Sequence, residues 1–425
     1  MKSSKVMAAL VTLGLAAAVA TPAMALENQF SGSFTSFYDI SNYSASGVLA
    51  KDAATQNYFV QRVRLGYTAK ASDDVKLVTK FELDYNWYGN NSYDNTRGGG
   101  AALGADGINL ETKNLYLDLN VAKGLNAKIG MQPYNDSFKG IIFDADMAGV
   151  LLSHEYEKAS ITAGFFRFAD RTKTAADMST IGKYTQDMFS LDAKYNIAKE
   201  IKVGAAYYYF GDNRDPVKEA KVHNVGINFD TEVGHVALSG FGLAQFGDIT
   251  NTQKAKGFAL NVGAKMPVAG GTARTELLYA GGGKNALYVP ASDNGGTEGG
   301  GFYDAEMIML NRDKNATTID NAIVYDSNNA NQGVIMGSIG FDYPITTKLS
   351  SSVNAGFAAV AKDTAAAGVH KSNYLGTEVN CEANYKLMPT VTLGARAGYV
   401  VLGDYFKGTN YDNPYDVKLI AKFAF

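Results

Sequence analysis

The sequence has little cysteine, tryptophan or proline: one, one and eight residues among 425. With Cys381 alone, an intrachain disulfide framework, a thiolate metal site and haem attachment through paired cysteines are all excluded. The four histidines are too far apart in sequence to form a helical pair of metal ligands. Lysine and arginine number 39 against 42 acidic residues, and this near balance argues against a nucleic-acid-binding protein. No cofactor or metal is therefore expected.

Long apolar runs are also scarce. Apart from the run from Val6 to Ala20, no segment is apolar over the length of a helical membrane span. Two lysines precede this run, and the small-x-small triplet Ala23-Met24-Ala25 follows it. The pattern predicts a cleaved secretory signal peptide over 1–25 and a single domain over 26–425. If that domain crosses a membrane, it needs strands closed into a barrel, because lipid satisfies no backbone polar groups.

Alternation of apolar and polar residues with a period of two runs along the rest of the chain. In the segment 75–87, every odd-numbered residue is apolar, aromatic or threonine, and the even-numbered residues are mostly charged or asparagine. Strands of soluble proteins are commonly about five or six residues long. A tilted strand needs about ten residues to cross a bilayer. The segment therefore predicts a wall with one lipid face and one water face.

The expected fold is an all-β, transmembrane, antiparallel up-and-down barrel of 18 strands. These strands are expected near 28–40, 57–70, 75–88, 108–121, 125–133, 149–157, 159–169, 185–197, 200–211, 221–231, 234–246, 256–267, 271–281, 332–343, 347–360, 373–387, 390–403 and 413–425. Short periplasmic turns and long extracellular loops, including 282–331, would alternate along the chain. Glycine blurs the pattern around 149–169 and 234–246, so 16 strands is an alternative.

The polar side of these strands would face a water-filled lumen. By parity of position, lumen-lining charges are expected at Arg62, Arg64, Lys76, Lys80, Glu82, Asp84, Asp118 and Lys128. Charges between low-dielectric walls set the ion selectivity of a pore, and this mixture favours a general pore with a mild anion preference. Catalysis is not expected, because Ser153 and His154 are adjacent on a strand and would point to opposite faces.

Two segments resemble Gram-negative outer-membrane porins. The residues from Asp416 to Phe425 place Val417, Leu419, Ala421 and two phenylalanines on one face. This ending is similar to the closing signal that the assembly machinery of these proteins reads, with Phe423 and Phe425 as the signal residues. The segment Lys128-Ile129-Gly130-Met131-Gln132-Pro133-Tyr134-Asn135-Asp136 resembles the junction of the fifth strand and third loop in the same family.

The resemblance implies that the third loop, here 134–148, folds into the lumen and narrows it. Its candidate pore-constriction charges are Asp136, Lys139, Asp144 and Asp146. The apolar triplet Ile141-Ile142-Phe143 would dock the loop against the inner wall. The resemblance also implies a homotrimer in the outer membrane, in contact with lipid and lipopolysaccharide, that passes ions and small hydrophilic solutes. Two alternatives are a substrate-specific sugar or anion channel and a barrel that sheathes an electron-transfer or secretion partner.

Overall fold

The structure is a computed structural model that describes residues 26–86, 110–170, 181–215, 219–290, 303–314, 320–366 and 368–425. The expected signal peptide, 1–25, lies outside the described residues. The strands are β1 (Glu27–Ser41), β2 (Gln56–Ser72), β3 (Val75–Asn86), β4 (Glu111–Ala122), β5 (Leu125–Asn135), β6 (Asp144–Glu155), β7 (Ala159–Asp170), β8 (Thr185–Ala198), β9 (Ile201–Asp212), β10 (Ala220–Val233), β11 (Val236–Asp248), β12 (Phe258–Val268), β13 (Gly271–Ala280), β14 (Val334–Pro344), β15 (Leu349–Ala359), β16 (Tyr374–Met388), β17 (Val391–Leu402) and β18 (Tyr415–Ala424). Two short 3-10 turns, η2 (Gly283–Asn285) and η3 (Asp404–Phe406), are the helical elements of this part of the chain. No helix among the described residues is long and apolar enough to span a membrane.

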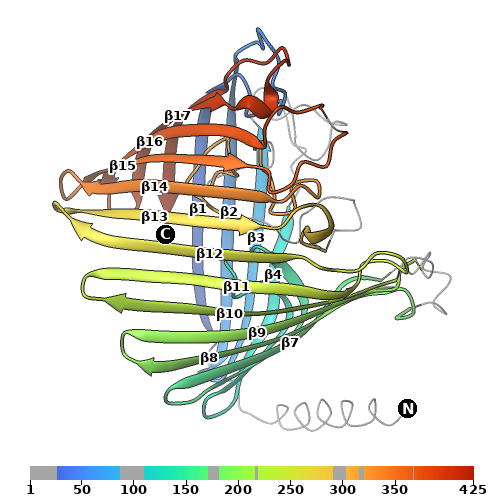
Figure 1. The fold of residues 1–425 in the computed structure, drawn as a ribbon. Helices are drawn as coiled ribbons and strands as arrows, with labels where there is room; N and C mark the ends of the chain where they lie inside the picture. The colour runs from blue at the N-terminus through green and yellow to red at the C-terminus, as the bar shows by residue number, and fades with distance from the viewer. Residues whose placement is uncertain are drawn as a thin grey trace.

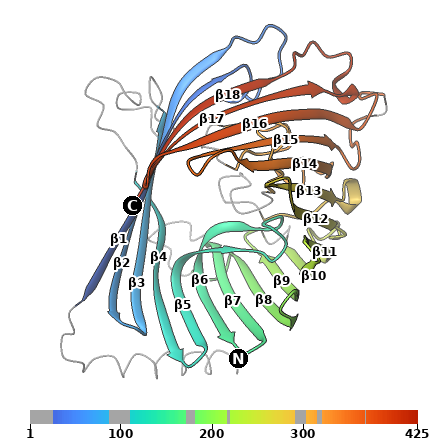
Figure 2. The ribbon, with the colours of Figure 1, turned by 90° about the vertical axis from the view of Figure 1, so that its left-hand side faces the viewer.

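The 18 strands form one closed antiparallel sheet. Each strand pairs with its neighbours in sequence, and β1 pairs with both β2 and β18, so the sheet has no free edge. Figure 1 shows β1 to β3 crossing behind the strands of the near wall, and Figure 2 shows the strands following one another around the barrel. The expected 18-stranded barrel is confirmed, and the alternative of 16 strands is wrong.

The connections alternate in length as the sequence predicts. At one end of the barrel, turns of two to four residues join β2 to β3, β4 to β5 and the later pairs up to β16 and β17. At the other end the connections are longer, up to the segment between β13 and β14. One short turn needs glycine, because Gly124 has a positive φ of 75° and an added Cβ would lie 2.7 Å from the backbone oxygen of Glu155.

The wall has an apolar outer face, and its inner face carries polar residues together with an apolar region that the inward-folded segments cover. On β10, Ile227 is 67% exposed, whereas Asn224 on the opposite face is fully buried. On β18, Leu419 is 54% exposed and its neighbour Lys418 is only 2% exposed. Apolar side chains exposed on the outside of a closed barrel match the hydrocarbon of a bilayer.

The third long connection is shorter than the sequence suggests. The range 134–148 was expected to be a loop, but β5 continues to Asn135 and β6 begins at Asp144. The reason is cross-strand pairing, because Tyr134 lies opposite Ala145 and Asn135 opposite Asp144. The loop itself is therefore 136–143. Asp144 is an exposed residue at the start of a strand, and Asp146 lies inside that strand.

Candidate functional site

The loop 136–143 is organised around one buried carboxylate. Oδ1 of Asp136 accepts hydrogen bonds from the backbone N–H groups of Phe138 (2.7 Å) and Gly140 (3.0 Å). Its Oδ2 accepts from those of Ile142 (2.6 Å) and Phe143 (2.8 Å). Burial raises the pKa of Asp136 to about 6, although the four N–H donors act in the opposite direction. The expectation that Asp136 is a constriction charge is wrong, because its carboxylate faces its own loop.

Aromatic contacts hold this loop against the inner wall. The ring of Phe138 is fully buried, 5.8 Å from that of Tyr208 on β9 and 5.6 Å from that of Phe241 on β11. Phe143 lies edge-on to Tyr208 at 4.9 Å, and the neighbouring isoleucines, Ile141 and Ile142, are fully buried. The apolar residues of the loop thus pack inside the barrel and occupy part of its cross-section.

Lys139 is the charge that this loop presents to the lumen. Its backbone has a positive φ of 64°, and its Nζ forms an ion pair with Glu276 on β13. Glu276 also accepts a hydrogen bond from the side-chain amide of Asn261 at 2.9 Å. The loop and the opposite part of the wall are therefore joined through charged groups.

Two neighbouring cavities of about 540 and 530 Å³ lie inside the barrel beside this ion pair, and Lys139, Lys202 and Asp230 line both of them. Around the larger cavity the cationic groups include Lys139, Lys202, Lys265 and Arg274, and the acidic groups include Asp230, Glu276, Asp304 and Glu306. Burial raises the pKa of Asp304, which belongs to the long connection between β13 and β14. Cationic and acidic side chains therefore line the same cavity of the lumen.

A second charged patch lies on β2, β3 and β4. The buried Glu82 lies 3.7 Å from Arg62 and 3.3 Å from Lys113, and it also forms an ion pair with Arg64. Lys113 lies 3.0 Å from Asp146, so Asp146 is tied to the wall rather than carried on a loop as expected. Lys113 was not among the expected lumen charges, because a bulge where Lys80 and Phe81 meet β4 changes the parity of its position.

The other expected lumen charges lie along the neighbouring strands. Lys76 is opposite Asp118, and Asp118 is opposite Lys128. Lys128 also lies over the ring of Tyr116, with Nζ 5.6 Å from the ring centroid. Lys80 is partly buried on β3.

Asp84 on β3 lies opposite Arg62 on β2 in the strand pairing, but its side chain lies outside the described part of the structure. The expected assembly residues, Phe423 and Phe425, are exposed on the outer face with ring centroids 5.5 Å apart. The backbone of Phe425 exchanges two hydrogen bonds of 3.0 Å with Gly32, which joins it to β1.

A second inward segment, residues 303–314 and 320–324, packs on the wall formed by β15 to β18, and we call it the plug. Glu378 on β16 is fully buried and accepts hydrogen bonds from the backbone N–H groups of Ile308 (2.8 Å), Met309 (3.0 Å) and Leu310 (2.7 Å). The side chains of these three residues are buried as well. The sequence marks this segment by its apolar residues 307–310, but it does not reveal the carboxylate that receives them.

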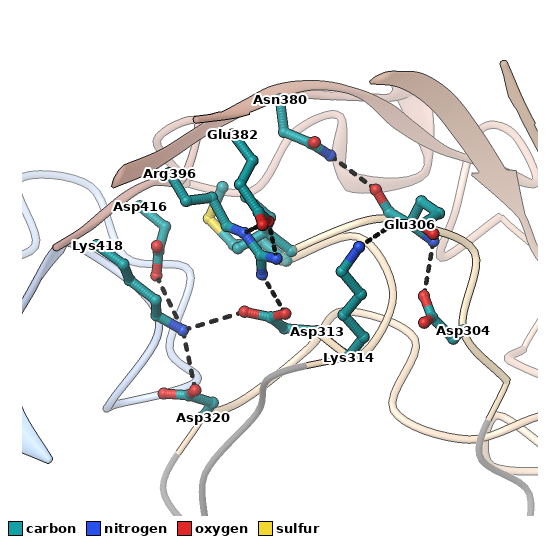
Figure 3. A network of polar contacts seen from close by, with 12 residues as sticks. Asp304, Glu306, Asp313, Lys314, Asp320, Asn380, Glu382, Arg396, Asp416 and Lys418 are labelled. Atoms are coloured by element: carbon teal, nitrogen blue, oxygen red, sulfur yellow. Dashed lines mark hydrogen bonds and ion pairs between the residues drawn. The ribbon is translucent and has the colours of Figure 1, made fainter. Parts of the chain in front are cut away.

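Ion pairs join the plug to the last two strands, as Figure 3 shows. Arg396 on β17 contacts Glu382 on β16 and Asp313 of the plug. Lys418 on β18 lies 2.9 Å from Asp320 and 3.4 Å from Asp313. Residues of the loop 136–143 and of the plug belong to one buried hydrophobic cluster with residues of the inner wall. Within the described ranges, no cluster of three or more His, Cys, Asp or Glu side chains is arranged to hold a metal ion.

No protein-family model and no curated protein matches this sequence. Solved structures do match its fold over nearly the whole chain. Pseudomonas aeruginosa OpdL has 12% identity and a TM-score of 0.58, with 94% of this chain and 99% of that chain covered. Pseudomonas aeruginosa OccK8 (OprE) has 11% identity and a TM-score of 0.59, with 94% and 98% covered. Acinetobacter baumannii OccAB1 has 12% identity and a TM-score of 0.56, with 94% and 96% covered. At such identities the likeness concerns the fold. The chain therefore has the barrel fold of the Gram-negative outer-membrane porins, and its apolar exterior fits it to that membrane.

Proposed function

We propose that this protein is a passive outer-membrane channel for ions and small hydrophilic solutes. The observation that carries the proposal is the lumen itself: two cavities lined by both signs of charge inside a wall whose outer face is apolar. Such an interior gives hydrated solutes a polar path through a membrane, and its mixed charges allow both cations and anions to enter.

A substrate-biased channel is favoured over a wide general pore. The loop 136–143 and the plug both pack inside the barrel, so a solute has to pass the groups that they leave exposed. Lys139 and Glu276 form a charged pair beside the loop 136–143 and the plug, and their charges would act on solutes at close range. The homotrimer and the contact with lipopolysaccharide that the porin resemblance implies remain part of this proposal.

The two other hypotheses find less support. A barrel that sheathes a partner protein needs an open interior, whereas here two segments of the same chain pack inside the barrel. For an enzyme, Ser153 and His154 were the candidate pair. Ser153 Oγ lies 3.0 Å from Thr162 Oγ1, while the His154 ring stacks on Tyr156 at 4.3 Å. The two side chains therefore have separate partners and do not form a nucleophile and base.

Planar-bilayer recording of the purified protein tests the function. Stepwise, ohmic current increments are expected, with a small reversal potential in a salt gradient because charges of both signs line the path. Lys139→Met should shift the reversal potential towards cation selectivity, since it removes a positive charge from the narrow region. Lys221→Met is the matched control, because Lys221 is exposed and pairs with Glu219 outside the lumen. Absence of current steps would overturn the proposal.

A further inference from the structure

We propose that the plug is a movable gate, held in its docked position by Arg396 and Lys418, and that its release widens the channel. This inference rests on the proposed channel function, since a gate needs a path to control. It assigns the regulation of that path to a contact between a connecting segment and strands β17 and β18.

The docked plug is held by specific contacts at both its backbone and its side chains. Three consecutive N–H groups of the plug bind Glu378, and the side-chain amide of Asn380 donates to the carbonyl of Glu306 at 3.0 Å. Ile308 fits over Gly398 of β17, where an added Cβ would lie 3.1 Å from Ile308 Cδ1 and 3.5 Å from Met309 Cε. The plug thus occupies a defined position on the wall.

The wall keeps counter-charges of its own, so that release of the plug leaves neither cation unpaired. Lys418 lies 3.4 Å from Asp39 on β1 and 3.9 Å from Asp416 on its own strand, in addition to its two plug partners. Both carboxylate oxygens of the fully buried Asp416 find no hydrogen-bond donor in the described residues. When the plug moves away with Asp313 and Asp320, Lys418 keeps Asp39 and Asp416 as its acidic partners.

Arg396 has the same arrangement. Its Nε donates to Glu382 on the neighbouring strand at 2.8 Å, and this pair belongs to the wall alone. On the plug, Glu306 forms an ion pair with Lys314 at 2.6 Å, which also survives release. An ordinary buried ion pair opposes separation because each partner is left charged and desolvated. Here both wall cations retain partners, so that penalty is reduced on the side of the wall.

The apolar contacts also suit a segment that docks repeatedly. Met307 and Met309 are two of the four buried side chains at residues 307–310. Methionine side chains are unbranched and adapt to different surroundings, so they tolerate a change of packing better than branched or aromatic residues. Docked and released positions are therefore both compatible with the composition of the plug.

Thiol labelling measures the position of the plug directly. Ala305 is buried in the docked plug, and the native Cys381 is exposed, so Ala305→Cys is placed in a Cys381→Ser background. Docking protects the introduced thiol from a water-soluble maleimide, and release exposes it. Heat-modifiable migration on gels verifies that the barrel of every variant is folded.

Two independent changes in this background should release the plug. Lys418→Met removes the cation that Asp313 and Asp320 share with the wall, and mutual repulsion of the carboxylates then disfavours docking. Gly398→Leu places a side chain where Ile308 and Met309 now lie. Each is expected to increase both the labelling rate and the open-channel conductance.

Each change has a matched control. Lys202→Met removes a lumen lysine that lines the cavities but lies on β9, whereas Arg396 and Lys418 lie on β17 and β18. Gly263→Leu enlarges an inward glycine whose nearest atom to an added Cβ is 3.4 Å away. Both controls should leave the thiol protected.

The outcomes separate the gate from the channel. If the unmodified protein conducts but folded Lys418→Met and Gly398→Leu variants keep a protected thiol and an unchanged conductance, the gate is overturned while the channel stands. Should one variant fail to fold, the other decides alone. A protein that never conducts overturns the channel function itself.

Discussion

Truncation of Phe138 tests whether the loop 136–143 narrows the lumen. The ring is fully buried between Tyr208 and Phe241, so Phe138→Ala removes a whole aromatic side chain from a packed site. Such a change costs about 3–5 kcal/mol in protein cores. Because about 1.4 kcal/mol corresponds to a factor of ten, the ratio of docked to undocked loop should fall roughly 10²- to 10⁴-fold. The barrel itself should persist, since its closed backbone hydrogen bonding does not involve this ring.

Two measurements check this prediction. The open-channel conductance should rise, and trypsin should cleave after Lys139, which an undocked loop presents to the protease. Phe229→Ala is the control, because Phe229 lies on the outer face of β10 and is exposed. Equal conductance and equal resistance to trypsin in the Phe138→Ala variant and the unmodified protein would refute the reasoning.

Three further changes probe other charged or aromatic groups. Replacing Arg62 and Arg64 by methionine should shift the reversal potential towards cation selectivity, and an unchanged value would count against their place in the lumen. Burial raises the pKa of Asp136 to about 6, above its ordinary value, so the stabilisation that it contributes is present in acid and lost as the pH rises through 6. Protease resistance of the loop should therefore fall from acidic to neutral pH relative to an Asp136→Asn variant, and parallel profiles would contradict this. Phe425→Ser keeps the backbone bonds to Gly32 but should lower the yield of assembled barrel in cells, whereas folding in detergent should not change; normal yield in cells would exclude an assembly role.

The wall could be predicted from sequence because its pattern is local. In the segment 75–87, alternation directly reports which side chains meet lipid and which meet water, and β3 appears where this pattern runs. The positions of the short turns follow from the same pattern, since polar and glycine residues interrupt it. Strand β6 was placed too late because the residues after Asp144 do not alternate cleanly, and their strand conformation comes from pairing with β5.

The loop contacts could not be predicted in the same way. Asp136 looks like a solvated loop acid in the sequence, and only the path of the backbone brings four N–H groups to it. Likewise, parity marks Lys418 as inward-facing, but nothing in its neighbourhood in sequence indicates Asp320, which lies almost a hundred positions earlier. Interactions over such separations depend on tertiary structure that no short window encodes.

The position of Lys418 beside the junction of β18 and β1 has a consequence for biogenesis. This ammonium group faces Asp39 directly across that junction, and Asp313 and Asp320 approach from the interior. This cluster of Lys418 and its acidic partners is complete only when β1 and β18 have paired. Before β1 and β18 meet, the plug can already bind Glu378 and Arg396, but the charged groups around Lys418 are incomplete. The final docked arrangement of the plug therefore follows closure of the barrel.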